Sequence, residues 1–391
     1  MKWETYKLKQ LCSEIVDCVN KTAPTSDVPT PYKMLRTSDI REGKINLENL
    51  NCVTKEVYEK WTRRGKLQKG DVIFTREAPL GEVGLVREEK NYFLGQRLVL
   101  FRANDKICDG RFLMYSLLWH DNKQAIISKG VGSTVAHLRV PECENIEIKA
   151  PDLDIQHRIA DILSAYDDLI ENNQKQIKLL EEATQRLYKE WFVDLRFPGH
   201  ENTKIVDGVP EGWKKERLVD IAEIQYGYAF DGTLFNADKN GTPIIRIRNI
   251  PQAETMDYTT EHVSENYLVQ NGEIIVGMDG EFHINAWAGN TAYLVQRVCC
   301  IRPKNTEIKG WLLQAIYEPI KFFERTVVGA TVAHLGKKHL DSIYLLTSPE
   351  EFYEPFKTFF DKRLLLMNQN RKLREARDRL LPKLMSGEVE V

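Results

Sequence analysis

The chain has 391 residues, of which 42% are hydrophobic and 29% are charged, and its formal net charge is −2. This length allows two or more domains, and the composition is that of a globular protein rather than a disordered or fibrous one. No run of 18 apolar residues occurs and the first residues lack the apolar core of a signal peptide, so we expect no membrane association. Seven scattered cysteines without a CxxC pair predict a cytoplasmic protein with reduced thiols and without metal or cofactor.

The sequence repeats itself at an offset that falls from 210 residues (Trp3 to Trp213) to 197 residues (Gly132 to Gly329). Five segments recur in the same order along the chain. They begin at Trp3 and Trp213, Arg36 and Arg246, Gly70 and Gly272, Gln96 and Gln296, and Gly132 and Gly329. A shared order with loops of variable length predicts one fold that is used twice for two related tasks.

Each repeat has the pattern of a mixed helix and strand domain. Short apolar runs at 71–74, 98–101 and 273–276 predict strands, and residues 113–118 and 311–316 predict short helices. The pattern does not distinguish parallel from antiparallel strands.

A long helical stretch follows each repeat. Between Asp154 and Phe192 there is no proline or glycine, and apolar residues recur at alternating spacings of three and four, which predicts a heptad seam. Pro382 and Gly387 predict the end of the second helix. Two related seams favour helices that pack on each other over helices that pack only on their own domains. The apolar seam residues are Leu163, Tyr166, Ile170, Ile177, Leu180 and Leu187 in the first stretch, and Phe359, Leu366, Leu373 and Leu380 in the second.

At these residues the chain resembles the specificity subunits of type I restriction–modification systems, over nearly its whole length. The motifs that carry the resemblance are the Gly-x-Thr-x-x-His-Leu segments at Gly132 and Gly329, the runs 156–163, 166–170 and 187–194, the start of the second repeat at Gly212 and Trp213, and the final run 380–387. One departure is that the second helical region lacks the Gln-x-Arg-Ile element found at Gln156.

The resemblance implies an α+β fold: two similar mixed α/β target-recognition domains, separated by two long helices that pack as an antiparallel coiled coil. It divides the chain into a first recognition domain (1–152), a central helical region (153–196), a second recognition domain (197–350) and a C-terminal helical region (351–391).

The resemblance also implies a non-catalytic subunit that reads a split, asymmetric site in double-stranded DNA. Its partners would be two adenine-methyltransferase subunits and motor–nuclease subunits. The sequence itself lacks the Gly-rich loop and Asn/Asp-Pro-Pro-aromatic motif of such a methyltransferase, and it has no Walker A motif. Two other interpretations stay open: the recognition subunit of another multi-subunit methyltransferase system, and a protein-interaction scaffold without a DNA role, which the near-neutral charge favours slightly.

Candidate DNA-binding residues are polar side chains in the repeated segments, because such groups bond to phosphates and base edges. Recurring residues such as Arg97 and Arg297 predict phosphate or structural roles, whereas Arg76, which aligns with Met278, is a candidate base reader. The Thr and His of the Gly-x-Thr segments have a structural alternative, in which Thr caps a helix and His packs beneath the sheet. The candidates are Arg36, Thr37, Ser38, Arg76, Gln96, Arg97, Ser133, Thr134 and His137, and Arg246, Arg248, Asn249, Gln296, Arg297, Thr331 and His334.

Overall fold

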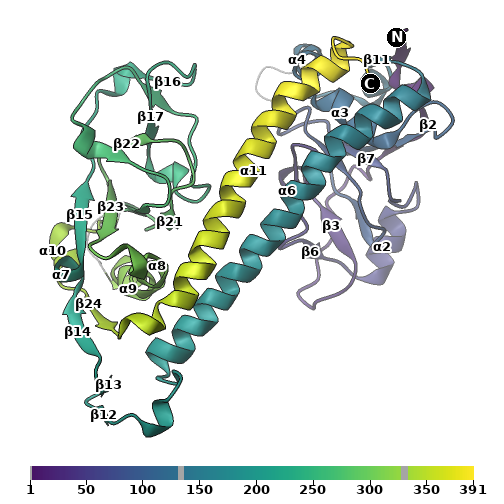
Figure 1. The fold of residues 1–391 in the computed structure, drawn as a ribbon. Coiled ribbons are helices and arrows are strands. Elements are labelled where there is room, and N and C mark those ends of the chain that lie inside the picture. The colour runs from purple at the N-terminus through teal and green to yellow at the C-terminus, as the bar shows by residue number, and fades with distance from the viewer. Residues whose placement is uncertain (1, 131–135, 327–332) are drawn as a thin grey trace. The chain divides into compact units, whose positions relative to one another are not determined.

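The computed structural model describes residues 2–130, 136–326 and 333–391 (Figure 1). The chain forms two compact units: unit 1 comprises Met1–Asp168 and Arg374–Val391, and unit 2 comprises Leu169–Leu373. Each unit contains one copy of the sequence repeat together with a segment of each of the two long helices. The internal repeat therefore corresponds to the division of the chain.

The core of unit 1 is a four-stranded antiparallel sheet, which consists of β2 (Cys12–Asp17), β10 (Leu98–Ala103), β7 (Val72–Thr75) and β8 (Val83–Leu85) in this order. All residues of β7 are buried, because both faces of the sheet are covered. Val72 and Phe74 pack in one cluster with the buried residues of α3 (Gly110–Leu118), whereas Ile73 packs in another cluster with Leu35. Two covered faces explain why this strand is a continuous apolar run rather than an alternating one.

Shorter elements complete unit 1. β3 (Lys33–Leu35) pairs in parallel with β9 (Tyr92–Leu94) and antiparallel with β6 (Asn51–Cys52), so both strand directions occur. β1 (Glu4–Lys7) pairs with β11 (Glu147–Ala150) just before the first long helix. The remaining elements are α1 (Leu8–Leu11), β4 (Ile40–Arg41), β5 (Lys44–Ile45), α2 (Lys55–Trp61), α4 (His120–Ser128) and α5 (Val140–Glu144).

Unit 2 repeats this plan. Its central antiparallel sheet consists of β15 (Ala222–Tyr226), β23 (Val298–Pro303), β20 (Ile274–Gly277) and β21 (Ile284–Ala286), and β17 (Thr242–Ile245) pairs in parallel with β22 (Ala292–Leu294). β14 (Lys214–Arg217) pairs with β24 (Tyr344–Thr347), as β1 does with β11. The remaining elements are β12 (Ile205–Val206), β13 (Val209–Pro210), α7 (Leu218–Ile221), β16 (Phe235–Asn236), β18 (Tyr258–Thr259), β19 (Leu268–Val269), α8 (Lys309–Ala315), α9 (Tyr317–Thr326) and α10 (Lys337–Asp341).

A partly buried ion pair recurs at the same place in both sheets. In unit 1 the guanidinium of Arg102 lies 2.9 Å from the carboxylate of Asp71, whose side chain is 2% exposed. In unit 2 Arg302 lies 2.6 Å from Glu273. Each acid also accepts a backbone N–H three residues before it, at 2.7 and 2.8 Å, and so closes the turn that leads into β7 or β20. Both charges of each pair are therefore satisfied where they are buried, as low-dielectric surroundings require.

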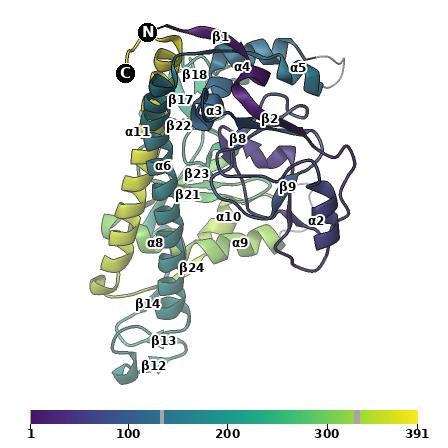
Figure 2. The ribbon, with the colours of Figure 1, turned by 90° about the vertical axis from the view of Figure 1, so that its right-hand side faces the viewer.

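The two predicted long helices are α6 (Leu153–Tyr188), which continues into a π-helical turn (Lys189–Val193), and α11 (Glu354–Ser386). The ten apolar seam residues predicted from the sequence are all buried or half-buried. In unit 2 the two helices lie side by side in both views (Figures 1 and 2), with Asn173 bonded to Asn370 and Glu181 bonded to Arg363. Residue numbers that rise on one helix and fall on the other make this pair antiparallel, as predicted.

The polar seam residues Asn173 and Asn370 meet where the two helices pair. Each lies 23 residues after the last residue of the strand before its helix, Ala150 of β11 and Thr347 of β24. Both side chains are 3% exposed, and the Asn173 amide donates to the Asn370 carbonyl oxygen at 3.0 Å. A single polar pair inside an apolar seam is satisfied in only one register of the two helices.

In unit 1 the helices are joined to the domain core through Asp167. Its carboxylate accepts a hydrogen bond from the Tyr115 hydroxyl of α3 at 2.5 Å and pairs with Arg377 of α11 at 2.5 Å. Burial raises the pKa of the Tyr115 hydroxyl, which therefore stays protonated as a donor. Asp167 thus links α3, α6 and α11 in one buried network.

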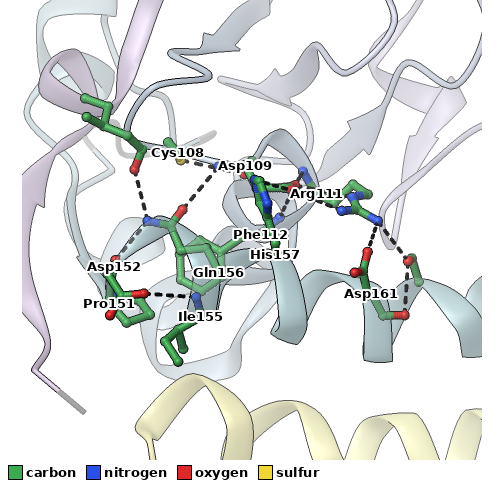
Figure 3. Close-up of polar contacts among 12 residues, drawn as sticks. Cys108, Asp109, Arg111, Phe112, Pro151, Asp152, Ile155, Gln156, His157 and Asp161 are labelled. Atoms are coloured by element: carbon green, nitrogen blue, oxygen red, sulfur yellow. Dashed lines mark hydrogen bonds and ion pairs between the residues drawn. The ribbon is translucent and has the colours of Figure 1, made fainter. Parts of the chain in front are cut away.

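The start of α6 is fixed by Gln156, the glutamine of the Gln-x-Arg-Ile element (Figure 3). Its side chain is 1% exposed, and its amide nitrogen donates to the carbonyl oxygens of Ile107 at 3.0 Å and Pro151 at 2.9 Å. Its amide oxygen accepts the backbone N–H of Asp109 at 3.1 Å. Asp109 in turn caps α3 by accepting two backbone N–H groups. Gln156 therefore binds the helix to the loop before α3.

The second long helix starts with different chemistry at the equivalent place. Gln156 is the sixth residue after β11, and the sixth residue after β24 is Tyr353. Tyr353 is 5% exposed, and its hydroxyl oxygen accepts the backbone N–H of Ser348 at 2.8 Å. A buried polar side chain thus occupies the same chain position in both regions, but Gln156 lies in the first turn of α6, whereas Tyr353 directly precedes α11.

The prediction that Pro382 takes part in ending the second helix is wrong, because α11 continues through it to Ser386. Leu384 and Met385, which follow the proline, are 1% and 2% exposed in the core of unit 1, so their burial maintains the last turn. Gly387 ends the helix with φ +78°, and a Cβ there would lie 2.7 Å from Nε1 of Trp3. Both chain ends therefore meet in unit 1 (Figure 2).

The asparagine pair yields a stability prediction. Asn370→Leu leaves the buried amide of Asn173 without its partner, so we expect a loss of roughly 1–3 kcal/mol in the free energy of unfolding. The double variant Asn173→Leu/Asn370→Leu should recover most of this loss, because no amide then stays unpaired. Urea unfolding followed by circular dichroism measures both. A double variant as unstable as the single one would show that the amide pairing is not the cause.

Candidate nucleic-acid interface

The first repeated candidates form two similar tight turns. In unit 1 the carboxylate of Asp39, which is 5% exposed, accepts the backbone N–H of Arg36 at 2.8 Å and pairs with its guanidinium at 2.8 Å. In unit 2 the side-chain oxygen of Asn249 accepts the backbone N–H of Arg246 at 2.8 Å. These bonds close the 3-10 turns Thr37–Asp39 and Ile247–Asn249. The repeated part of this segment bonds within the protein and shapes the backbone.

The other polar groups of these turns differ between the units. Ser38 places its hydroxyl 3.4 Å from the Asp39 carboxylate, and the Thr37 carbonyl oxygen accepts a bond from Arg41 at 3.0 Å. Arg248 pairs with Asp257, yet its side chain is 62% exposed. Arg248 and Ser38 are therefore the exposed members of this group.

The structure brings Gln96, Arg97 and His137 together in unit 1. Arg97 has a left-handed backbone with φ +69°, and its carbonyl oxygen accepts the backbone N–H of Arg76 at 2.8 Å. Its Nε lies 3.3 Å from Oε2 of Glu77, and the Arg97 side chain is 52% exposed. Glu77 also forms an antiparallel backbone bridge with His137. Residues from three segments that are distant in the sequence thus meet at one place.

Unit 2 repeats the arrangement closely. Arg297 has φ +70°, its carbonyl oxygen accepts the backbone N–H of Met278 at 2.8 Å, and its Nε lies 3.3 Å from Oδ2 of Asp279. Asp279 forms an antiparallel bridge with His334, whose Nδ1 lies 2.5 Å from the Asp279 carboxylate and 3.2 Å from Nη1 of Arg297. We call each of these groups of arginine, acid and histidine an arginine site.

The arginine site of unit 1 opens into a hollow of about 300 Å³. Gln96 lies at its wall, and its side-chain oxygen accepts a bond from the Thr22 hydroxyl at 3.0 Å. The hollow has the size and the donors to receive a small anionic group. Its lining residues are Asn20, Arg76, Glu77, Gln96, Arg97, His137 and Leu138.

Beneath the arginine sites the two units differ. In unit 1 the guanidinium of Arg76 pairs with Asp17 at 3.0 Å, and its side chain is only 17% exposed. In unit 2 Met278 takes the place of Arg76, and Tyr226 takes the place of Asp17, as the strand registers against β10 and β23 show. Burial raises the pKa of Tyr226 to about 12. An ion pair in one domain thus corresponds to two mostly apolar side chains in the other.

Some predicted residues lie outside the described part of the chain. Ser133 and Thr134, and with them Thr331, belong to the segments 131–135 and 327–332. The histidine and leucine that end each segment are described, and Leu138 and Leu335 are 1% and 0% exposed. The choice between a phosphate contact and a structural role for the threonines therefore stays open.

The two acids of the arginine sites, Glu77 and Asp279, are not among the residues predicted from the sequence. Each acid follows the predicted strand of a repeated segment, Glu77 in the Gly70 segment and Asp279 in the Gly272 segment. A recurring acid at this position could therefore have been recognised from the sequence repeat. The left-handed backbone of Arg97 and Arg297 gave no such signal, because arginine has no preference for that conformation.

Other kinds of site find little support in the described residues. Among residues 2–130, 136–326 and 333–391, no group of three or more His, Cys, Asp or Glu is placed to hold a metal ion. All seven cysteines are free, and burial raises the pKa of Cys12, Cys143 and Cys299 to about 12, so these thiols stay protonated near neutral pH. None of the described helices has the length and apolar character that a membrane crossing requires.

Comparison with known proteins gives a consistent result. The family model described as the type I restriction modification DNA specificity domain matches residues 1–182 and 210–351. The MjaIX specificity subunit of Methanocaldococcus jannaschii is 26% identical over 83% of this chain and 78% of its own length. The HindI specificity subunit of Haemophilus influenzae is 22% identical over 91% of this chain and 94% of its own.

A solved structure shares the fold. The S subunit of a type I restriction–modification system from M. genitalium superposes with a TM-score of 0.61 at 16% sequence identity, over 98% of this chain and 96% of that one. At this identity the likeness concerns the fold alone.

The Arg76–Asp17 pair yields the next prediction. Arg76→Ala removes the shorter ion pair of the Asp17 carboxylate, which is 31% exposed, and leaves only the contact to Arg64 at 3.6 Å, so we expect a loss of roughly 1 kcal/mol in unfolding free energy. Asp17→Tyr/Arg76→Met, which introduces the residues found in unit 2, should be less harmful because it removes both charges. Thermal unfolding monitors both. Arg76→Ala with wild-type stability would mean that the ion pair does not support the site.

Proposed function

Because the chain belongs to the type I restriction–modification DNA specificity family, we propose that it is the non-catalytic subunit that reads a split, asymmetric site in double-stranded DNA. Each domain reads one half of the site. The helices recruit two adenine-methyltransferase subunits, and motor–nuclease subunits join this complex for cleavage. The protein acts in the cytoplasm.

The observation that carries the proposal is the duplicated arginine site on two domains of the same fold. Arg97 and Arg297 have nearly the same backbone angle, the same 3.3 Å contact to an acid and nearly the same exposure, 52% and 54%. The residues beside them differ, as Arg76 and Met278 do. A shared framework with different neighbours suits two domains that contact DNA in the same way and read different bases.

The long helices support the proposed recruitment. Their seam residues face inward, yet three leucines of unit 2 stay exposed on the same helices: Leu169 at 46%, Leu179 at 64% and Leu365 at 51%. Exposed large apolar side chains on an otherwise charged helix pair favour a protein partner. We assign this surface to the methyltransferase subunits.

Modular reading is tested by replacing one domain. Residues 1–150 are exchanged for the matching domain of a relative with a different target, and the methylated motif is determined by methylome sequencing of the host. We expect one half of the motif to change and the other half to stay the same, because each domain has its own sheet and core. A change in both halves would contradict the proposal, and an unmethylated genome after deletion of the gene serves as the control.

The helices are expected to set the gap between the half-sites. One heptad is inserted after Gln176 and another after Leu366, so that both insertions face each other and the seams stay in register. Seven residues add about 10 Å of helix at roughly 1.5 Å per residue. The unspecified gap in the methylated motif should lengthen, or binding should be lost if the added rotation is not accommodated, while the bases read stay the same.

The matched control inserts two residues at the same points, which breaks the seam and should prevent assembly with the methyltransferase subunits. Full activity with an unchanged gap in the heptad variant would show that the helices do not set the spacing.

A further inference from the structure

Arg97 and Arg297 have a backbone conformation that glycine adopts more readily than arginine. Their φ angles are +69° and +70°, in the left-handed region that disfavours residues with a Cβ. Burial does not explain the choice of arginine, since the side chains are 52% and 54% exposed. A strained residue that occurs at equivalent positions of both domains indicates that its side chain is needed there.

The ion pairs with Glu77 and Asp279 do not account for this need. In each unit the pair has one contact of 3.3 Å between Nε and a carboxylate oxygen, and the acids are 30% and 29% exposed. Ion pairs with this exposure contribute little to stability. The acid lies beside the Nε edge of each guanidinium, so N–H donors on the Nη atoms can still reach another group.

The surroundings of the arginine fit a phosphate group. In unit 1 the hollow beside Arg97 is lined by the side chains of Gln96, Asn20 and His137, which offer further hydrogen bonds. In unit 2 His334 lies 3.2 Å from Nη1 of Arg297. A planar guanidinium with two Nη groups matches two phosphate oxygens. The arrangement recurs in both domains, whereas base-reading groups are expected to differ between them.

On the basis of the proposed DNA recognition, we infer that each domain binds one phosphodiester group of the DNA backbone through this arginine, and that Glu77 and Asp279 weaken this contact on every sequence. A phosphate contact positions a domain on the duplex without sequence information. A carboxylate beside the phosphate opposes it electrostatically, which keeps sequence-independent binding low and leaves the choice of site to the base contacts.

Glycine variants separate phosphate binding from a structural role. Arg97→Gly and Arg297→Gly remove the guanidinium and the backbone strain together, so thermal stability should stay equal or rise. The complex with the methyltransferase subunits is tested on a duplex that contains the methylated motif and on a random duplex of equal length. We expect each variant to bind both about tenfold more weakly. The slope of log affinity against log salt should become shallower by about one.

Two results would contradict the inference that these arginines bind phosphate. Unchanged affinity for both duplexes would leave the arginines a structural role only. A loss confined to the motif duplex would make them base readers.

Neutral variants of the acids test their opposing charge. Glu77→Gln and Asp279→Asn keep the shape and an acceptor oxygen for the arginine but remove the negative charge. We expect tighter binding to the random duplex and therefore a smaller preference for the motif duplex. Equal or weaker binding to the random duplex would show that the acids only orient the arginines, and this part of the inference would be wrong.

Arg217→Ala is the matched control, since Arg217 is 49% exposed and pairs with Asp220 at 2.8 Å but lies outside the arginine site. It should bind both duplexes as the wild type does. The wild-type complex tests the proposed function separately. No preference for the motif duplex would contradict the proposed function, whereas a clear preference together with unaffected arginine variants would contradict only the inference.

Discussion

The two long helices are joined by buried polar contacts and their apolar residues pack into the domain cores, and the other features of the chain are arranged around this pairing. In unit 2 the bond between Asn173 and Asn370 leaves one register in which both buried amides are satisfied. In unit 1 Asp167 holds Tyr115 and Arg377 together, so that the same seam is fixed to the domain core. The pairing also explains why residues 374–391 belong to the unit formed by the first 168 residues.

Because the domain occurs twice, the chain itself separates framework from variation. The turn before the central strand holds a partly buried ion pair in both units, although aspartate in one corresponds to glutamate in the other. The helix starts keep a buried polar side chain, although Gln156 corresponds to Tyr353. By contrast, Arg76 and Asp17 correspond to Met278 and Tyr226, so charge is exchanged for apolar volume beneath the arginine sites. Polar groups inside the protein therefore keep a partner in both units, whereas the side chains that fill the space beneath the arginine sites differ.

The sequence was sufficient for features that follow from periodicity. The apolar runs at 71–74 and 98–101 became central strands, and the heptad pattern predicted the two long helices, whose antiparallel arrangement was implied by the family resemblance. The sequence pattern did not predict local conformations that depend on contacts with residues distant in the sequence. Pro382 stays helical because the following turn is buried in unit 1, and Arg97 takes its left-handed backbone within contacts to Arg76 and Glu77 that no local pattern encodes. Local sequence patterns therefore predicted the helices and strands, whereas the geometry of the arginine sites is found only in the structure.

The near-neutral charge of the chain, −2, is compatible with DNA binding once the pairing of its arginines is considered. Arg97 and Arg297 each have an acid at 3.3 Å, and Arg76 has Asp17 at 3.0 Å. A paired guanidinium still donates hydrogen bonds, but its long-range field is largely cancelled by its neighbour. In the proposed function, such a surface would attract DNA weakly from a distance and bind it through short-range contacts. Strong affinity then requires many contacts at once, which only a fitting sequence provides.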